Sequence, residues 1–400
     1  MIKREIYMKK IRKFMDKKII KVITGIRRCG KSVMLQLIIE ELIKKGVNRD
    51  NILLYNFESA ENTNLTTGSA LYDDVKERIS RLKGRVYLFF DEVQDVAEWE
   101  KYINSFQVDF DVDIYVTGSN AKLLSGELAT LISGRYVEIT IYPLSYIEFM
   151  SMYRTVYKDT SDEDAFRKYI VLGGMPFLLD LDFGELAGTQ YLHDIYTSVV
   201  IKDVMKRNNF RDIDLLERII LYIAANIGQT FSAMSISNFF KSEHRKVATE
   251  TVINHLKACE EAFLFHKVRR QDVIGKRILQ ISEKYYIADH GIREAIYGNN
   301  QRDIAQVLEN LVFMEMLRRG YKITVGRMDS REIDFICERG TETIYLQVTY
   351  LLNDTETVNR EFDVLKKIPD NFPKYVLSLD EIDLSRDGIK HMNVREFLKG

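Results

Sequence analysis

The chain has 400 residues, of which 46% are hydrophobic, so a mainly disordered protein is excluded and roughly two to four domains are expected. Lys and Arg total 58 and Asp and Glu total 59, so at a net charge of −1 any affinity for nucleic acid must come from local patches. Cys29, Cys259 and Cys337 lie far apart without CxxC spacing, which argues against a disulfide framework or a zinc site. No stretch approaches 18 uncharged apolar residues, and the basic N-terminus has no apolar region behind it. We therefore expect a cytoplasmic protein that neither leaves the cell nor spans a membrane.

The first motif is GIRRCGKS at residues 25–32, which fills the G-x-x-x-x-G-K-S pattern at every fixed position. An apolar, β-branched run at residues 19–24 precedes it, and a run with helical periodicity follows and ends at Gly46. In this order of strand, loop and helix, backbone N–H groups wrap phosphates at the N-terminus of the helix. We predict that Lys31 reaches the β and γ phosphates of ATP and that the Ser32 hydroxyl binds Mg²⁺. The predicted nucleotide-binding residues are Gly25, Ile26, Arg27, Arg28, Cys29, Gly30, Lys31, Ser32 and Val33.

A second strand, RVYLFFDEVQDV at residues 85–96, is apolar until it reaches Asp91 and Glu92. Parallel strands present ligands at their C-terminal ends, so these acids are expected beside the phosphate loop. We predict that Asp91 holds Mg²⁺ and that Glu92 orients or deprotonates the attacking water. The alternative is a pair of solvated acids that follow a core strand.

Two further β-rich runs, at residues 51–59 and 111–120, end in polar residues. The second run ends with Ser119 and Asn120, which suits a strand that senses the γ-phosphate beside the phosphate loop. Polar residues end many strands, so this alternative stays open. Glu58 ends the other run and is expected either near the attacking water or as a helix cap.

The segments GIRRCGKS, FFDEVQDVAEWE, VTGSNAKLLSGELATLISGRYVEI and LGGMP together resemble a prokaryotic family of AAA-type ATPases with a C-terminal domain of unknown function. The resemblance covers nearly the whole chain and is most specific in TGSN followed by SGELATLISGR, which ends at Arg135. It implies an AAA-like or STAND-like core that takes ATP as its ligand. It also makes Arg135 a candidate γ-phosphate-sensing arginine, because a guanidinium can neutralise charge that develops in phosphoryl transfer. A surface salt bridge is the alternative.

After Tyr142 and Pro143, helical patterns predict a lid or connector at residues 143–210, in which a Gly-Gly-Met-Pro loop at 173–176 has no assigned chemistry. Three helices and two strands then follow in residues 211–296, the order of a winged helix-turn-helix domain. Residues 241–284 hold ten Lys or Arg and six Asp or Glu, a local charge of +4, and are predicted to contact DNA phosphates. A protein-docking module and a simply solvated hairpin are the alternatives. The basic hairpin residues are Lys267, Arg269, Arg270, Lys276 and Arg277, and the third helix would present Lys246, Thr249, Thr251 and Asn254.

The last region, residues 297–400, reads as a helix followed by three strands, with Glu309 on the helix, Asp334 on one strand and Gln347 on the next. This arrangement resembles the PD-(D/E)xK nuclease fold, in which the acids bind Mg²⁺ and a lysine two positions after the Glu or Gln activates water. Thr349 stands at that position here. We therefore expect a nuclease-like domain that does not cut and keeps at most a vestigial metal site at Glu309 and Asp334, with Glu332 beside them.

Taken together, the sequence predicts an α/β protein with an AAA-like core at residues 1–142, a helical connector at 143–210, a winged helix at 211–296 and a nuclease-like domain at 297–400. The predicted function is hydrolysis of Mg·ATP in association with DNA. Two alternatives are a nucleotide-dependent switch or scaffold that recognises a protein partner or a second copy of the chain, and an ATP-regulated, metal-dependent nuclease.

Overall fold

The structure is a computed structural model that describes residues 2–121, 134–273, 275, 278–328 and 331–400. The chain divides into two compact units. The first comprises Met1–Tyr142 with the short segment Glu261–Phe263, and the second comprises Pro143–Glu260 and Leu264–Gly400. Over the described ranges, no helix has the length and apolar character needed to cross a membrane.

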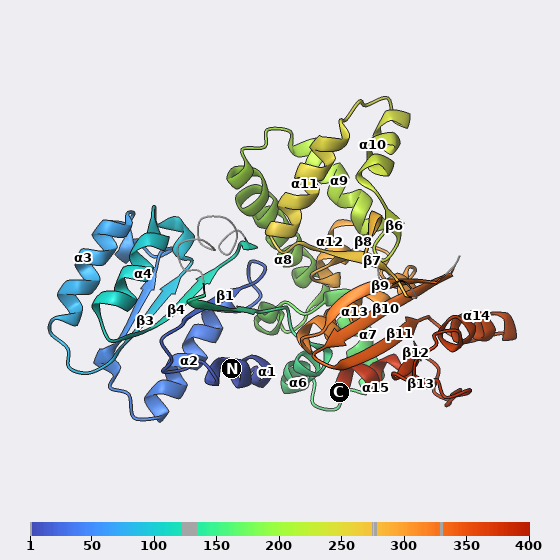
Figure 1. Cartoon of the computed structure of the whole chain (residues 1–400), viewed down its shortest axis with the longest axis horizontal. Coiled ribbons are helices and arrows are strands. Elements are labelled where there is room, and N and C mark those ends of the chain that lie inside the picture. Colours follow the sequence, from blue (N-terminus) through green and yellow to red (C-terminus); the bar gives the residue numbers. More distant parts are fainter. Residues whose placement is uncertain (1, 122–133, 274, 276–277, 329–330) are drawn as a thin grey trace. The chain divides into compact units, whose positions relative to one another are not determined.

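The first unit is built on a five-stranded parallel sheet in the order β2-β3-β4-β1-β5 (Figure 1). Strands β1, β3 and β4 are buried along their whole length, which explains their uninterrupted apolar runs, because helices cover parallel sheets on both faces. The strands are β1 Ile20–Thr24, β2 Ile52–Asn56, β3 Val86–Asp91, β4 Val112–Gly118 and β5 Tyr136–Thr140. The helices are α1 Glu5–Arg12, α2 Lys31–Lys44, α3 Gly68–Ile79 and α4 Trp99–Asp109.

The core of this sheet is apolar and rich in aromatic side chains. Phe90 of β3 stacks on Phe106 of α4, with ring centroids 5.8 Å apart, and both side chains are fully buried. Leu71 and Val75 of α3 join the same cluster. This packing buries β3 along its length. Asp91, predicted to hold Mg²⁺, ends the strand, and Glu92, predicted to act on the attacking water, follows it.

The second unit begins with helices that are interrupted by the Gly-Gly-Met-Pro loop. The Asp289 carboxylate accepts a hydrogen bond from the Gly174 backbone N–H at 2.7 Å. At Gly173, where φ is +72°, a Cβ atom would lie 2.2 Å from the same carboxylate. The paired glycines therefore let one buried carboxylate tie the loop to a helix more than 100 residues later, a structural role that the sequence did not indicate. The helices here are α6 Tyr146–Val156, α7 Asp162–Leu172, α8 Glu185–Ser198 and the π-helix η6 Val199–Lys206.

An eight-stranded sheet in the order β13-β12-β11-β10-β9-β7-β8-β6 forms the rest of this unit. Its strands are β6 Thr230–Phe231, β7 Phe265–Asp272, β8 Ile278–Ile287, β9 Lys322–Met328, β10 Arg331–Arg339, β11 Glu342–Val348, β12 Lys374–Ser378 and β13 Lys390–Asn393. Its helices are α9 Ile213–Ala225, α10 Ala233–Ser242, α11 Thr249–Glu261, α12 His290–Ile296, α13 Ile304–Arg318, α14 Thr355–Lys366 and α15 Val394–Lys399.

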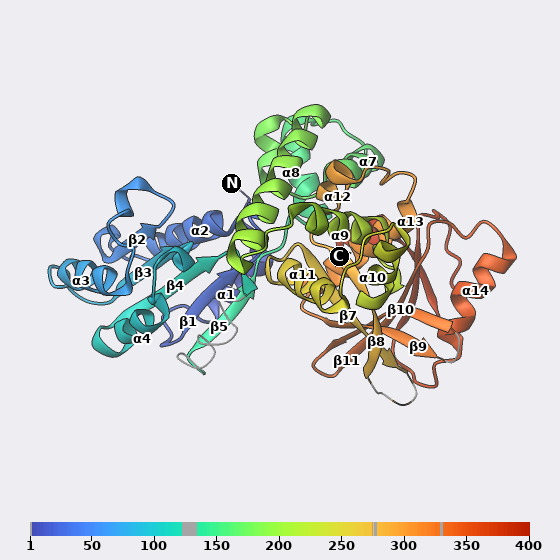
Figure 2. The same ribbon diagram turned by 90° about the horizontal axis from the view of Figure 1, so that it is seen from above.

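The hairpin β7–β8, predicted as the wing of a separate domain, belongs to the same sheet as the C-terminal strands (Figure 2). Strand β7 pairs in parallel with β9, with Arg270 opposite Val325. A hairpin has two edges with unpaired backbone groups, and β9 satisfies one of them. The expected boundary between residues 296 and 297 is therefore not a break in the sheet.

The C-terminal elements begin in the expected order of one helix and three strands, and α14 and β12 follow. Strands β9, β10 and β11 are antiparallel neighbours, while β12 runs parallel to β11 after α14. A bulge between Ile333 and Ile336 of β10 interrupts the pairing with β9 at Asp334. Bulges re-aim side chains near functional sites, and this one coincides with an acid that the sequence singled out.

Candidate functional site

The loop between β1 and α2 has a backbone conformation that requires glycine at two positions. Gly25 has a φ of +143°, and a Cβ atom there would lie 2.2 Å from the Ile141 carbonyl oxygen. Gly30 caps α2 with a φ of +103°, and it provides no side-chain cap for the first N–H groups of the helix. The Cys29 thiol donates to the Ile141 carbonyl at 3.2 Å, and burial raises the pKa of this thiol. The loop thus leaves a helix N-terminus uncapped by any side chain, as an anion site requires.

Lys31 is buried in this loop and is only 4% exposed. Its Nζ atom lies 3.2 Å from the Gly25 carbonyl oxygen, 3.3 Å from that of Ile26 and 3.3 Å from Glu92 Oε1. The ammonium therefore spans from the phosphate loop to the acidic end of β3. The structure brings together these two motifs, which lie about 60 residues apart in the chain.

Asp91 and Glu92 end β3 and are linked through Thr117 of β4. The Thr117 hydroxyl donates to Asp91 Oδ1 and accepts a hydrogen bond from the Glu92 backbone N–H at 2.9 Å. Burial raises the pKa of Asp91, and hydrogen bonds from Thr117 and Ser32 offset part of that rise. Ser32 and Asp91, the two predicted Mg²⁺ ligands, are therefore hydrogen-bonded neighbours.

Glu92 is held on both of its carboxylate oxygens. Lys31 lies 3.3 Å from Oε1, and Gln94 Nε2 donates to Oε2 at 2.6 Å. Burial alone would raise the pKa of Glu92, but the Lys31 ammonium and the Gln94 hydrogen bond outweigh it, and the pKa falls below its ordinary value. The carboxylate is therefore ionised at neutral pH, as a base must be. Gln94 was not predicted, although it stands only two residues after Glu92.

The remaining predicted residues at this site fall into two groups. Ser119 and Asn120 are buried and follow β4, the strand that pairs with β1. Arg27 pairs with Glu58, with Nη1 3.1 Å from Oε1, and its charge also contributes to the lowered pKa of Glu92. These four side chains therefore belong to the same end of the sheet as the phosphate loop.

Arg135 does not. It precedes β5, which is parallel to β1 with Tyr136 opposite Ile20, so it lies at the end of the sheet where β1 begins. The loop follows the other end of β1, at least about 13 Å further along the strand. The guanidinium is exposed and donates to Asn104 Oδ1 at 2.8 Å. Within one chain the strand direction therefore places Arg135 away from the phosphate loop, and its role as a γ-phosphate-sensing arginine stays a prediction. The residues from Ser125 to Ser133 of that motif lie outside the described part of the chain.

The sequence did not indicate that an arginine before α1 would contact the phosphate loop. Arg4, just before α1, is buried, and its guanidinium donates to the Cys29 carbonyl at 3.0 Å and to the Tyr142 carbonyl at 2.8 Å. It thereby fastens the phosphate loop to the last residue of the first unit. The basic N-terminal run gave no indication which of its residues would be buried.

The acids predicted in the C-terminal region lie close together, but around a lysine that the sequence analysis did not single out. Lys284 of β8 places Nζ 2.9 Å from Glu309 Oε1, 2.7 Å from Glu332 Oε1 and 3.9 Å from Asp334 Oδ1. Tyr286 donates to Glu309 at 2.6 Å. Among the described residues, no three His, Cys, Asp or Glu side chains are arranged to hold a metal ion. In the structure these acids form an ion-pair cluster around Lys284, and the vestigial metal site at Glu309 and Asp334 stays a prediction.

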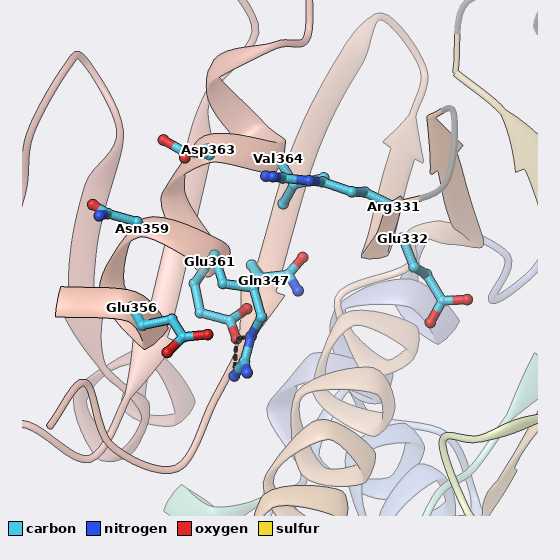
Figure 3. Close-up of a pocket in the computed structure, with 9 residues that line it drawn as sticks. Arg331, Glu332, Gln347, Glu356, Asn359, Glu361, Asp363 and Val364 are labelled. Atoms are coloured by element: carbon cyan, nitrogen blue, oxygen red, sulfur yellow. Dashed lines mark hydrogen bonds and ion pairs between the residues drawn. The ribbon is translucent and has the colours of Figure 1, made fainter. Parts of the chain in front are cut away.

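Next to this cluster lies a polar cavity of about 800 Å³, lined in part by Glu332 and Gln347. Figure 3 shows Gln347 and Glu361 facing the cavity, with Glu361 paired to Arg360 at 2.8 Å, while the Glu332 carboxylate points away from both. Gln347 Oε1 accepts from the Asp334 backbone N–H at 3.2 Å, so it also braces the neighbouring strand.

The predicted DNA-contacting surface is only partly available. Lys267 lies 3.5 Å from Glu283, and Arg270 lies 3.8 Å from Glu332, so these two charges are partly neutralised. Arg269 is exposed, as are Lys246 and Asn254, while Thr249 and Thr251 are half-buried. Lys276 and Arg277 lie outside the residues whose positions are described.

Comparison with known proteins gives matches for two segments and for the whole chain. Residues 17–150 match a family described as an AAA domain, and residues 163–303 match a domain of unknown function. An uncharacterized protein of Haemophilus influenzae is 38% identical over 399 residues, which cover 100% of this chain and 98% of that protein. The uncharacterized protein MJ1544 of Methanocaldococcus jannaschii is 29% identical over 94% of this chain and 84% of its own length.

Similarity to solved structures is low. The structure of the Aeropyrum pernix ORC1 protein in complex with DNA is 13% identical and covers 73% of this chain and 91% of its own, with a TM-score of 0.35. AMPPCP-bound DnaA from Aquifex aeolicus is 12% identical over 63% of this chain and 85% of its own, with a TM-score of 0.31. Scores at this level carry no argument about what this chain binds.

Proposed function

This chain belongs to the same protein family as the uncharacterized Haemophilus influenzae protein and carries an AAA domain at residues 17–150, and from this premise we propose that it binds and hydrolyses Mg·ATP. The observation that carries the proposal is the contact between Lys31 of the phosphate loop and Glu92 at the end of β3, 3.3 Å apart. It supports a site in which one residue meets the phosphates and the other meets the water that attacks them.

The residues present fit both ATP and Mg²⁺. Gly25 lets the loop pass against the Ile141 carbonyl, where no Cβ atom would fit, and the first turn of α2 has no side-chain cap, which suits an anion. Ser32 and Asp91 offer a hydroxyl and a carboxylate oxygen side by side, the kind of ligand that Mg²⁺ prefers. When bound, Mg²⁺ would neutralise part of the charge on the phosphate oxygens.

The residues of the chain suggest how binding prepares hydrolysis. Within the described ranges, Lys31 contacts two loop carbonyls and Glu92, and a triphosphate offers it a stronger partner. When Lys31 turns to the phosphates, Glu92 Oε1 becomes free to accept a proton from water. Gln94 continues to hold Oε2, and Thr117 holds the Glu92 backbone, so the base keeps its orientation.

Nucleotide binding and turnover of the Glu92→Gln variant test this proposal. We expect binding of ATP to be kept, because glutamine still offers an oxygen to Lys31, and turnover to fall by roughly 10²-fold or more because the base is lost. Glu61→Gln, at an exposed position in the same unit, is the matched control and should leave turnover unchanged. If the wild-type protein hydrolyses ATP no faster than Glu92→Gln, hydrolysis is not its function and a nucleotide-dependent switch becomes the better description.

Association with DNA is a finer proposal that rests on the exposed Lys246, Asn254 and Arg269 of a region ordered like a winged helix. ATP turnover measured without DNA, with single-stranded DNA and with duplex DNA tests it. Stimulation that weakens as salt rises, and that Arg269→Ala reduces, would support phosphate contact. Equal turnover in all three conditions, together with no binding of duplex DNA at low salt, would favour a protein partner or a second copy of the chain instead.

A further inference from the structure

The cluster around Lys284 collects charged side chains from three separate elements of the second unit. Lys284 comes from β8, Glu309 from α13, and Glu332 and Asp334 from β10. The lysine is only 3% exposed, and its ammonium lies within 2.9 Å of two carboxylates and 3.9 Å from the third. In the nuclease-like fold that this order of elements resembles, those acids would hold a divalent metal.

We propose that the Lys284 ammonium occupies the cation position of this nuclease-like site, so that the protein does not bind a divalent metal there and removal of Lys284 opens the site to one. The inference is independent of the proposed ATP hydrolysis, because it concerns only residues of the second unit.

Donors of the protein itself already engage the carboxylates of this cluster. Glu309 accepts from Lys284 and from the Tyr286 hydroxyl, both on Oε1. Glu332 accepts from Lys284 on Oε1 and from the Thr230 hydroxyl on Oε2 at 3.3 Å. A metal ion would have to displace these donors before it could reach the same oxygens.

Asp334 is engaged in the same way. Its Oδ2 accepts from the Val348 backbone N–H at 2.8 Å, and its Oδ1 lies 3.9 Å from Lys284 Nζ. A metal ion would have to displace the backbone donor or approach the ammonium to reach either oxygen.

Electrostatics also disfavour a divalent ion at this place. The Lys284 ammonium already supplies a positive charge to the cluster, with Nζ 2.9 Å from Glu309 and 2.7 Å from Glu332. Arg270 adds a second positive group 3.8 Å from Glu332. A divalent ion at the same place would meet both positive charges in a poorly solvated site, where repulsion is strong. Without Lys284, three buried carboxylates would lack their main counter-charge and would favour a cation from solution.

The Glu332 side chain also points in a direction that does not suit a shared metal site. Its carboxylate turns away from Gln347 and Glu361, which face the cavity (Figure 3). A metal shared by the acids of β10 and by Gln347 would need these oxygens to converge. Lys284 instead draws Glu332 toward β8, which accounts for the observed direction.

Binding of Mn²⁺ to the full-length protein without nucleotide, followed by calorimetry and by the loss of the free-ion electron paramagnetic resonance signal, tests this proposal. All proteins compared carry Asp91→Asn, which removes the carboxylate predicted to hold Mg²⁺ at the nucleotide site. With Lys284 in place we expect no Mn²⁺ site that depends on Glu309 or Asp334. Lys284→Ala and Lys284→Met, whose side chain is longer, should each gain one Mn²⁺ site. We expect this site to bind Mn²⁺ at least roughly tenfold more tightly than the protein with Lys284 intact does, and adding Glu309→Gln should remove it again.

Either of two Mn²⁺-binding results would overturn the proposal. One is a Mn²⁺ site in the protein with Lys284 intact that Glu309→Gln or Asp334→Asn abolishes, and this measurement stands whether or not the Lys284 variants fold. The other is a folded Lys284→Ala or Lys284→Met protein, shown by its circular dichroism, that gains no site. Cleavage of DNA by the intact chain that requires Mg²⁺ and disappears in Asp334→Ala would likewise overturn it, because Lys284 would then act in a metal-dependent nuclease.

Discussion

Two buried lysines, one in each unit, form ion pairs of similar length but with very different surroundings. Lys31 meets one carboxylate and two carbonyl oxygens on a glycine-rich loop, whereas Lys284 meets three carboxylates from a helix and a strand of a continuous sheet. The partners of Lys31 are few and exchangeable, so a phosphate can replace them. The partners of Lys284 are numerous and fixed, so that lysine holds elements together. Burial and charge alone therefore do not distinguish a binding lysine from a structural one.

The same comparison appears in the acids. Lys31, the Gln94 hydrogen bond and the charge of Arg27 together bring the pKa of Glu92 below its ordinary value, despite burial. For Asp334, burial and the Glu309 charge raise the pKa, and Lys284 offsets only part of that rise. The charges and donors around each acid therefore decide the direction in which its pKa moves.

Replacing each lysine with alanine and measuring the free energy of unfolding tests whether the two lysines differ in their structural role. We expect Lys284→Ala to lower the free energy of unfolding by about 3–5 kcal/mol, because it leaves buried carboxylates without their counter-charge. Lys31→Ala should cost less than about 1 kcal/mol, since its single carboxylate keeps the Gln94 hydrogen bond. Urea unfolding followed by circular dichroism measures both. Equal losses in the two variants would show that the two lysines are energetically alike.

The two variants should affect ATP turnover in the opposite order, with the larger loss in Lys31→Ala. Lys31→Ala should lower ATP turnover by roughly 10²- to 10³-fold, because a charge aimed at the phosphates is lost. Lys284→Ala, measured per folded molecule, should stay within about twofold of the wild type because it touches no residue of the nucleotide site. Lys44→Ala, on the exposed end of α2, is the control for Lys31. A loss of turnover in Lys284→Ala as large as that in Lys31→Ala would contradict the separation of roles.

Thr117→Val sharpens the account of the acids beside Lys31. The change removes a donor to Asp91 and an acceptor for the Glu92 backbone N–H while keeping a similar shape. We expect a stability loss of about 1–3 kcal/mol from the unpaired buried groups and about a tenfold loss of turnover. Steady-state ATP hydrolysis and thermal unfolding report the two effects. Thr63→Val, at an exposed turn position in the same unit, should change neither.

The smallest effect concerns Asp334→Asn, and its sign depends on pH. Because the folded-state pKa of Asp334 is raised, the wild type loses stability as pH rises from the unfolded value toward the folded one. Asparagine does not titrate and still accepts from the Val348 N–H. The variant should therefore be more stable than the wild type by about 1 kcal/mol at pH 8, a gain that shrinks toward pH 5. A gain that grows on acidification would show that Asp334 is ionised in the folded protein.

Much of the first unit could be predicted because its signals are local. The phosphate loop depends on eight consecutive residues, and the acids stand directly after an apolar strand, so short windows contain the information. Arg135 shows the limit of this reasoning. Its position in a motif suggested a role, but whether it reaches the phosphates depends on the direction of β5 relative to β1, which the motif does not encode.

The sequence by itself determined the phosphate loop, the acidic strand end and the order of elements in the C-terminal region, because spacing, periodicity and composition act within a few turns of chain. Only the tertiary structure decided that β7 pairs with β9 and thereby joins the predicted wing to the C-terminal sheet. Only it placed Lys284 among three acids that lie 25 to 50 residues away in the sequence. The reason is physical: the partner of a buried charge is set by strand pairing and helix packing over long separations, and these interactions leave no local pattern to read.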